Sequence, residues 1–98
     1  MCGQSGIDIL MKTIALEWGP EGVRANCITP GPTEDTEGMR RLAPTEEDRR
    51  KVVCSIPLGR YGTKDELADL ALFLCSDAAS YITGAVFVCD GGQSLSRH

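Results

Sequence analysis

The side chains that most often perform catalysis are few in this sequence and are poorly spaced to act together. Its single histidine, His98, is the last residue, so neither a Cys/His pair nor a Ser/His/Asp triad is expected. Cysteines are widely and irregularly spaced and form no Cys-x-x-Cys pair: Cys2, Cys27, Cys54, Cys75 and Cys89. This pattern predicts neither a zinc site nor a disulfide framework. We expect no metal site, small buried thiols at Cys27, Cys75 and Cys89, and a reducing, intracellular compartment.

The turn formed by Pro30, Gly31 and Pro32 is better suited to binding than to catalysis. The apolar run at 23–29 predicts a strand, and the prolines cannot continue a sheet, so the turn lies at the carboxyl end of that strand. Ligands of open α/β sheets bind beyond the carboxyl ends of strands, and glycine lets the backbone approach them closely. An ordinary turn between a strand and a loop is the alternative interpretation.

Two arginines follow this turn in a polar stretch, residues 33–42, which predicts a loop or a short helix. Arg41 could bind a phosphate group through bidentate hydrogen bonds, and the adjacent Arg40 is equally suited to do so. Solvated surface charges are the alternative interpretation of both. Glu34, in the same stretch, disfavours a nearby phosphate unless its carboxylate points to water.

Helices and strands must position these residues. Three segments have helical signals, and each starts with a hydroxyl side chain that can cap the helix. Apolar residues recur with helical spacing in two of them, and the third, 45–55, has acidic residues in its first turn and basic residues later. The predicted helices are 5–18 with Ser5 as N-cap, 45–55 with Thr45, and 63–75 with Thr63, where Glu66 completes a capping box. A second strand is predicted at 85–89, where an apolar run without alternation is typical of a parallel strand covered on both faces.

The composition excludes several classes of protein. With 98 residues, 42% hydrophobic and 24% charged, the chain is one small globular domain or part of a larger one. Its net charge of −4 disfavours nucleic acid as a partner. No apolar run approaches the roughly 20 residues that span a bilayer, and residues 1–7 lack the basic start of a secretory signal. Because two strands cannot bury both faces of a sheet, we expect these residues to belong to a larger one.

Five motifs follow one another along the chain. They are Ala15-Leu16-Glu17-Trp18-Gly19, the run from Val23 to Pro32, the run from Gly59 to Ala68, Phe73-Leu74-Cys75-Ser76 with Ala79 to Gly84, and Asp90-Gly91-Gly92. Each is weak alone, but in this order and spacing they resemble the C-terminal half of the short-chain dehydrogenase/reductase family over nearly all of residues 6–92. Three features of the sequence most resemble the 2,4-dienoyl-CoA reductases, which act on unsaturated fatty acyl-CoA with NADPH. They are the Pro-Gly-Pro turn, Thr36-Glu37-Gly38, and Gly62-Thr63 followed by Glu66-Leu67-Ala68.

The resemblance implies an α/β fold, namely the C-terminal half of a doubly wound, Rossmann-type parallel sheet, with residues 1–98 forming part of one domain. It also implies that Pro30, Gly31, Pro32 and Thr33 border the nicotinamide end of NADPH, with NADH as the alternative. Arg41 would contact the CoA part of the fatty acyl-CoA substrate. Helix 6–18 would pack against its counterpart in a second subunit, giving a homo-oligomer. Tyr81, Thr83 and Asp90 would have structural roles.

The residues that carry catalysis in this family lie upstream of the part that the sequence matches. The Gly-rich phosphate loop, the proton-donating tyrosine and the carbonyl-polarising serine have no counterpart in 1–98, and Gln4 stands where the resemblance places the catalytic lysine. A neutral amide cannot replace an ammonium group beside the ribose or lower the pKa of a neighbouring acid. We therefore expect no catalytic residue in this sequence. The chain would be a truncated and inactive part of a reductase, of the type that reduces 2,4-dienoyl-CoA in the β-oxidation of unsaturated fatty acids.

A non-enzymatic role is the alternative. The apolar surface of helix 6–18 could pair this chain with a full-length relative. We expect a cytoplasmic location first, with the mitochondrion or the peroxisome as further possibilities. The end of the chain, Ser96-Arg97-His98, only partly resembles the peroxisomal Ser-Lys-Leu signal, because His98 is unsuited to the last position.

Overall fold

The computed structural model describes residues 2–95, and the side chains from residue 6 onward. The described chain forms two compact units, one made of residues 2–29 and 70–87 and the other of residues 30–69 and 88–95. The four α-helices within these residues are α1 (Cys2–Trp18), α2 (Glu37–Leu42), α3 (Glu46–Cys54) and α4 (Lys64–Cys75). Short 3-10 helices are η1 (Gly19–Glu21), η2 (Asp77–Ala79) and η3 (Gln93–Leu95).

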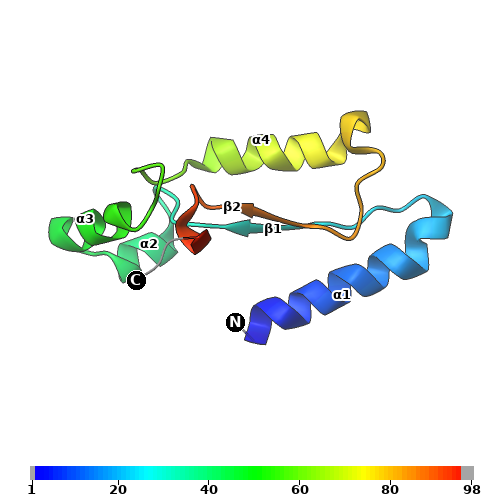
Figure 1. Cartoon of the computed structure of the whole chain (residues 1–98), viewed down its shortest axis with the longest axis horizontal. Coiled ribbons are helices and arrows are strands. Elements are labelled where there is room, and N and C mark those ends of the chain that lie inside the picture. Colours follow the sequence, from blue (N-terminus) through cyan, green and yellow to red (C-terminus); the bar gives the residue numbers. More distant parts are fainter. Residues whose placement is uncertain (1, 96–98) are drawn as a thin grey trace. The chain divides into compact units, whose positions relative to one another are not determined.

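The sheet within the described residues consists of two parallel strands, β1 (Cys27–Pro30) and β2 (Val86–Cys89), which run in the same direction in Figure 1. The Cys27 N–H donates to the Ala85 carbonyl oxygen and the Gly31 N–H to that of Cys89, both at 3.0 Å. Both partners advance by four residues, as parallel pairing requires. The strands predicted at 23–29 and 85–89 and their parallel connection through a helix are thus confirmed, although each strand is shorter than predicted. Strand β1 also includes Pro30, which was predicted to lie beyond it.

Side-chain hydrogen bonds replace the sheet ladder where β1 was predicted to begin. Asn26 donates from Nδ2 to the Ile82 carbonyl oxygen and accepts at Oδ1 from the Ala85 N–H, both at 3.1 Å. The Thr83 hydroxyl oxygen accepts from the Ala25 N–H at 3.1 Å. These bonds hold the backbone before β1 against the turn before β2, and they give Thr83 the structural contact that was expected of it.

Two of the three predicted helix caps are correct. The hydroxyl oxygen of Thr45 accepts from the Asp48 N–H at 3.1 Å, and that of Thr63 accepts from the Glu66 N–H at 3.1 Å. Ser5 is not a cap, because α1 begins three residues earlier, at Cys2. Residues 33–42, predicted as a loop or a short helix, contain α2, whose cap is Thr36.

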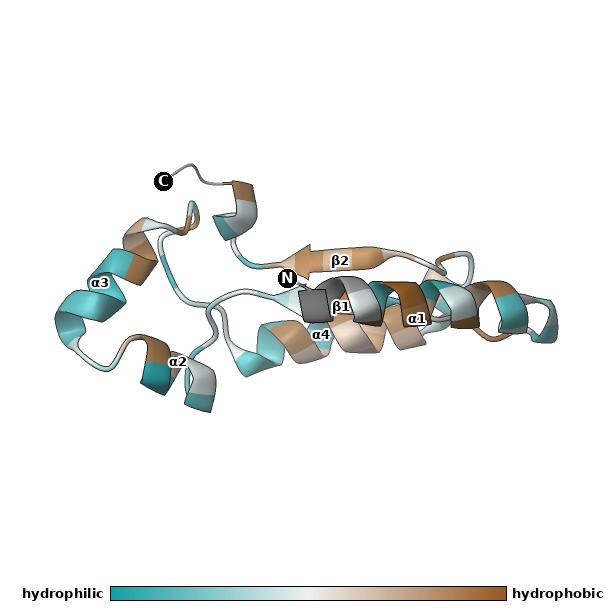
Figure 2. Ribbon diagram, turned by 90° about the horizontal axis from the view of Figure 1, so that it is seen from below, coloured by the Kyte–Doolittle hydropathy of each residue, from teal (hydrophilic) through white to brown (hydrophobic). Residues whose placement is uncertain are grey.

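Helix α1 buries one side and leaves the other open. Met11 and Ala15 are buried, with Ala15 close to Gly84 just before β2. Apolar side chains on the adjoining face, Ile7, Leu10 and Trp18, are each more than half exposed. Brown segments on α1 and β2 in Figure 2 show this apolar character. A helix with apolar residues on more than one side has surface for more than one packing partner, and α1 is such a helix.

Two burial predictions were wrong for the described chain. Strand β2 is not covered on both faces, since Val88 is 53% exposed and Val86 36%. Cys75 is exposed rather than buried, because the α4 residue that enters the core is its neighbour Leu74. Cys27 and Cys89 are half-buried. Among the described residues, no helix has the length and apolar character needed to cross a membrane.

Candidate functional site

The candidate site lies where β1 ends. Gly31 has no room for a side chain, since a Cβ there would lie 2.5 Å from the Asp90 Cβ and 2.7 Å from the Asp90 Cα. The Gly31 N–H is already bonded to the Cys89 carbonyl oxygen. Close approach of the two strand ends therefore accounts for this glycine without any ligand.

Thr33 is the residue of this turn with a remaining donor for a ligand. Pro30 and Pro32 have no N–H, so of the four predicted contact residues only Thr33 can offer a backbone amide that is not bonded to β2. Thr33 is 5% exposed, and its hydroxyl donates to the Gly31 carbonyl oxygen at 2.9 Å. Of the four residues predicted to border a cofactor, Thr33 is thus the one whose backbone N–H is left unbonded by the strands.

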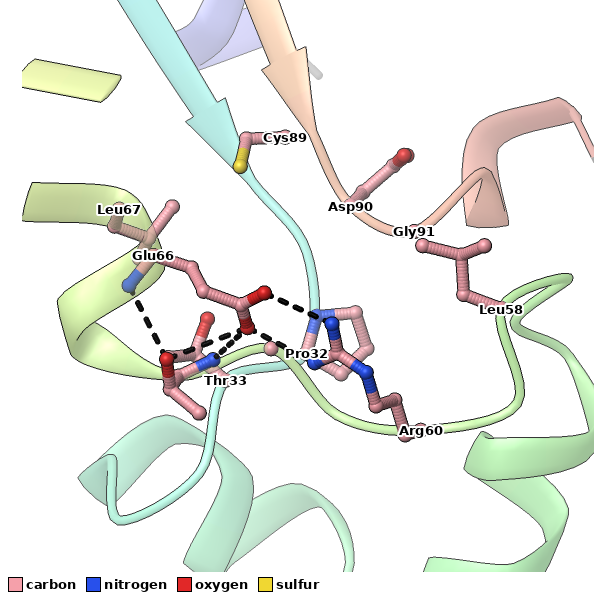
Figure 3. A pocket seen from close by; sticks show the side chains of 11 residues that line it. Pro32, Thr33, Leu58, Arg60, Glu66, Leu67, Cys89, Asp90 and Gly91 are labelled. Carbon is pink, nitrogen blue, oxygen red and sulfur yellow. Dashed lines mark hydrogen bonds and ion pairs between the residues drawn. The ribbon is translucent and has the colours of Figure 1, made fainter. Parts of the chain in front are cut away.

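A hollow of about 100 Å³ opens beside this strand end, and Figure 3 shows the side chains that line it. Apolar walls come from Pro32, Leu58 and Leu67, with Thr33 and Cys89 between them. Ligand pockets usually have about 300–1,000 Å³. The hollow is therefore too small to hold a dinucleotide or an acyl-CoA.

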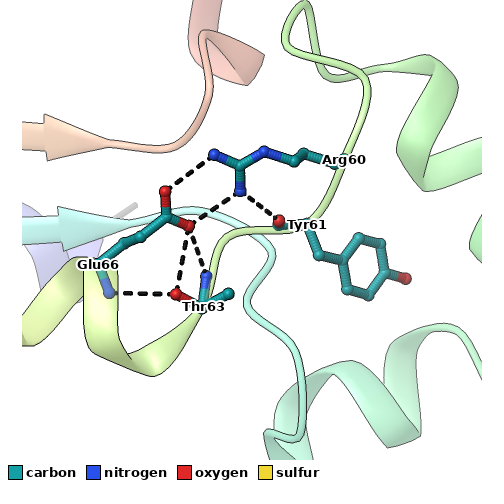
Figure 4. Close-up of polar contacts among 4 residues, drawn as sticks. All are labelled: Arg60, Tyr61, Thr63 and Glu66. Atoms are coloured by element: carbon teal, nitrogen blue, oxygen red, sulfur yellow. Dashed lines mark hydrogen bonds and ion pairs between the residues drawn. The ribbon is translucent and has the colours of Figure 1, made fainter.

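An ion pair between Arg60 and Glu66 forms one wall of the hollow (Figure 4). Arg60 Nη1 donates to Glu66 Oε1 at 2.9 Å and Nη2 to Oε2 at 2.8 Å, a bidentate arrangement. Glu66 Oε1 also accepts from the Thr63 N–H at 3.0 Å. Hydrogen bonds from Arg60 and then from Thr63 lower the pKa of Glu66 from its ordinary value to about 2. The carboxylate is therefore charged at any physiological pH and is not a proton donor.

Asp90 directly follows β2, and its carboxylate bonds the backbone of the turn after that strand. Its Oδ1 accepts from the Gly92 N–H at 2.8 Å and its Oδ2 from the Ser94 N–H at 2.9 Å. Burial by itself raises the pKa of Asp90, but the hydrogen bonds from Ser94 and Gly92 outweigh it and hold that pKa below the ordinary value. This geometry agrees with the structural role that was expected of Asp90.

The arginine predicted to bind phosphate is available at the surface. The side chain of Arg41 is 81% exposed, and its Nε lies 3.2 Å from Glu37 Oε1, one turn away on α2. Arg40 contacts the other oxygen of Glu37 at 3.5 Å. Glu34 is exposed in the loop before α2, as expected for a solvated charge. The structure does not join Arg41 and the strand end into one preformed pocket.

Sequence reasoning missed two features of this region. It assigned Glu66 to the helix cap but not to the pair with Arg60, and it overlooked Tyr61, which is buried beneath Arg49. A bulky aromatic inside a Gly-rich connector, Gly59 to Gly62, was the one available signal. Gln4 lies in α1, but its side chain is outside the described part of the structure.

Comparison with known proteins identifies the class. A family model described as "Enoyl-(Acyl carrier protein) reductase" matches residues 4–94. A Bacillus anthracis short chain dehydrogenase superimposes with a TM-score of 0.82 at 43% identity, covering 96% of this chain and 36% of that one. A 4-hydroxyisoleucine dehydrogenase complexed with NADH gives 0.89 at 27% identity, covering 98% and 39%. This chain belongs to the short-chain dehydrogenase/reductase family, and its fold is the expected part of the family's α/β sheet.

Two curated relatives have a more specific activity in their names. The peroxisomal 2,4-dienoyl-CoA reductase of Danio rerio is 48% identical over 89 residues, which are 91% of this chain and 30% of the relative. That of Saccharomyces cerevisiae is 46% identical over 90 residues, covering 92% and 30%. This chain therefore spans about a third of the length of these relatives.

Proposed function

We propose that residues 1–98 are the C-terminal part of a short-chain dehydrogenase/reductase domain whose complete form reduces 2,4-dienoyl-CoA with NADPH. The observation that carries the proposal is the sequence identity of 46–48% to two 2,4-dienoyl-CoA reductases over nine-tenths of this chain. The strand end at Pro30 to Thr33 supports it, because it lies at the carboxyl edge of a parallel sheet. NADPH, when bound, supplies the hydride.

The residues at the end of β1 can contact one end of a dinucleotide, but they do not include the groups that would bind its pyrophosphate. The Thr33 N–H can donate to an oxygen of the ligand, and the exposed Pro30 ring can contact its apolar face. Gly31 and Pro32 keep this backbone at the sheet edge, since Gly31 packs on Asp90 and Pro32 is buried. No Gly-rich phosphate loop occurs among the described residues, so the pyrophosphate must be bound elsewhere.

Arg41 is the proposed ligand of a phosphate group of the CoA moiety. Its guanidinium is exposed, and its partner Glu37 is 65% exposed, so the pair is weak enough for a doubly charged phosphate to displace. A reductase reconstituted as below should show a higher KM for the acyl-CoA in Arg41→Gln. Arg50→Gln, a matched change on the exposed side of α3, should leave that KM unaltered.

The isolated chain should be inactive. Catalysis in this family needs residues that act as a unit, and losing them typically removes several powers of ten in rate. We expect NADPH oxidation in the presence of 2,4-dienoyl-CoA to stay at the level of the control without enzyme. Turnover above that control would show that residues 1–98 contain a complete catalytic set.

A chimera tests the proposed function itself. Residues 6–94 should replace the matched segment of the Danio rerio reductase, and a second chimera should also carry residues 1–5. We expect NADPH-dependent reduction from the first and its loss from the second, because Gln4 would then occupy the proposed lysine position. Gln4→Lys should restore the rate. An inactive but folded first chimera, which still binds NADPH, would contradict the dienoyl-CoA assignment.

Pairing with another subunit is a second candidate function, favoured by the open face of α1. Leu10, Ile14 and Trp18 are still 62%, 37% and 54% exposed. Full burial of such a side chain is worth about 1.5–3 kcal/mol, so covering the part that is still exposed could contribute roughly 1 kcal/mol for each. A chain of this size buries only about 60–65% of its unfolded surface, so it should self-associate rather than persist as a monomer. We propose a homo-oligomer formed through residues 6–18, or pairing with a full-length relative.

Sedimentation at micromolar concentration tests this association. Leu10→Asp should shift the chain toward smaller species, because a charge on the open face opposes its burial. Leu16→Asp is the matched control, since Leu16 is 80% exposed on the opposite side of α1 from Ile14. A cooperative monomer in the unmutated chain, or equal effects of both variants, would refute the interface.

We propose an intracellular location for this chain, with the cytoplasm first and the peroxisome and the mitochondrion as alternatives. Two of the relatives are named peroxisomal.

A further inference from the structure

Gly62 holds the backbone on both sides of Thr33, the residue whose N–H is left for a ligand. The Gly62 N–H donates to the Pro32 carbonyl oxygen, and the Glu34 N–H donates to the Gly62 carbonyl oxygen, both at 2.9 Å. These bonds form an isolated parallel bridge between Thr33 and Gly62. Because the bridge uses the groups on either side of Thr33, the Thr33 N–H itself points away from Gly62. Its position therefore depends on where Gly62 lies.

The side chain and the carbonyl group of Thr33 make only local bonds. Its hydroxyl donates to the Gly31 carbonyl oxygen, and its carbonyl oxygen accepts from the Thr36 hydroxyl, both at 2.9 Å. These bonds tie Thr33 to its neighbours in the chain. The bridge to Gly62, in contrast, ties it to a different segment, the connector that leads into α4.

The residues on either side of Gly62 are both bonded to one ion pair. Arg60 Nη1 donates to the Tyr61 carbonyl oxygen at 3.1 Å, and the Thr63 N–H donates to Glu66 Oε1 at 3.0 Å. The two charged side chains bond each other through both guanidinium Nη atoms and both carboxylate oxygens (Figure 4). The pair therefore holds the connector on both sides of Gly62.

The geometry of this pair suits positioning better than stabilisation. The side chains of Arg60 and Glu66 are 55% and 43% exposed, and exposed ion pairs usually contribute little to the free energy of unfolding. Two parallel hydrogen bonds between planar groups nevertheless fix both a distance and an angle. Glu66 is itself anchored in the first turn of α4, where its N–H donates to the Thr63 hydroxyl oxygen at 3.1 Å. Both members of the pair line the same hollow as Thr33 (Figure 3).

We propose that Arg60 and Glu66 are positioning residues for cofactor binding: acting through Gly62, their ion pair sets where the Thr33 N–H meets the nicotinamide end of NADPH. Neither side chain needs to touch the cofactor, because backbone hydrogen bonds connect the pair to the two neighbours of Thr33. The identity of the ligand rests on the proposed function, whereas the placement of Thr33 by the ion pair does not.

Amide hydrogen exchange of the full chain, without cofactor, tests this placement. Glu66→Gln keeps the shape of the side chain but removes the charge that Arg60 binds. Charge-assisted hydrogen bonds are roughly twice as strong as neutral ones, so exchange of the Gly62 and Glu34 amides should become about three- to tenfold faster. Both amides are donors in the bridge, and they report directly on its opening.

Matched variants separate the ion pair from a general effect of charge. Glu47→Gln removes an exposed carboxylate from the first turn of another helix, α3, and should leave exchange of the Gly62 amide unaltered. Arg60→Gln should speed that exchange as Glu66→Gln does. The double variant should exchange no faster than the faster single variant, because residues that share one contact have non-additive effects.

The first chimera described above, which contains residues 6–94, tests the ligand. In it, Arg60→Gln and Glu66→Gln should each raise the Kd for NADPH, measured by fluorescence titration, by about three- to tenfold. The KM for 2,4-dienoyl-CoA at saturating NADPH should stay within about twofold of that of the unmutated chimera. A purely structural loss would lower the amount of active enzyme and leave the Kd unchanged, so a higher Kd separates positioning from stability.

The outcomes distinguish this proposal from the proposed function. Unchanged exchange at Gly62 and Glu34 would overturn it, whatever the chimera does. Faster exchange with an unchanged Kd for NADPH, or an equal rise in the Kd and in the KM for dienoyl-CoA, would overturn it as well. A chimera that binds NADPH more weakly after Glu66→Gln, but reduces no dienoyl-CoA in any form, would refute the reaction alone. A folded chimera that does not bind NADPH would refute both.

Discussion

Replacing Gly31 by alanine should force apart the ends of β1 and β2. The new Cβ would lie 2.5 Å from the Asp90 Cβ, whereas ordinary van der Waals contacts fall at 3.4–4 Å. The overlap of about 1 Å is with the Cα and Cβ of Asp90, which cannot rotate away as the end of a flexible side chain could. The hydrogen bond from the Gly31 N–H to the Cys89 carbonyl oxygen would have to lengthen.

The expected cost is large for so small a change. Overpacking of this kind destabilises proteins by about 1–3 kcal/mol, and loss of the strand hydrogen bond adds about 1 kcal/mol. We therefore expect the free energy of unfolding to fall by about 2–4 kcal/mol. In a chain of this size each kcal/mol lowers Tm by roughly 4–8 °C. Gly38→Ala is the control, because a Cβ at Gly38 in α2 meets nothing within 4 Å and alanine favours helix.

Thermal unfolding followed by circular dichroism measures both variants. Protein concentration must be equal throughout, since association changes Tm. Gly31→Ala should unfold well below the wild-type chain, and Gly38→Ala should unfold at the same temperature or above it. If Gly31→Ala stays within about 0.5 kcal/mol of wild type, the strand ends can separate freely and the packing explanation of this glycine is wrong.

Two further variants test the polar contacts. Glu66→Gln should flatten the dependence of stability on pH: the pKa of Glu66 is lowered to about 2 in the folded chain, so its contribution is present above about pH 4.5 and is lost as the pH falls toward 2. Urea unfolding of both chains at pH 7 and pH 3 measures this, and parallel losses in the two would contradict it. Thr45→Ala should lower the free energy of unfolding by about 1 kcal/mol through loss of the α3 cap. Thr45→Ser should retain most of that stability, and an equal loss in both would show that the hydroxyl is not the cause.

The sequence could predict features that depend on near neighbours in the chain. The caps at Thr45 and Thr63 follow from hydroxyl side chains three residues before a free N–H, and the structure confirms both. The two parallel strands were predicted because a helix between two apolar runs favours a crossover connection. The capping prediction failed at Ser5, since α1 extends to Cys2 and a serine within a helix has no free N–H to bond.

The candidate site was predicted only in part. Residues 30–33 do lie at the carboxyl edge of the sheet, but the pattern could not show that the Gly31 N–H is bonded to β2, which leaves Thr33 as the one amide donor of the turn. The exposure of Arg41 follows from its place in a charged stretch, whereas its pairing with Glu37 depends on the helix that forms there. The roles of these residues toward a cofactor and a substrate stay predictions.

By itself, the sequence determined the elements, their order and the family, because periodicity, caps and motif spacing are recorded along the chain. The tertiary structure alone decided which surfaces meet. It joined Arg60 to Glu66, placed Arg49 over Tyr61, and left Cys75 and Val88 exposed where an apolar context had predicted burial. Burial and side-chain pairing depend on how separate elements pack and on how the connectors between them fold, and helix or strand periodicity does not specify either.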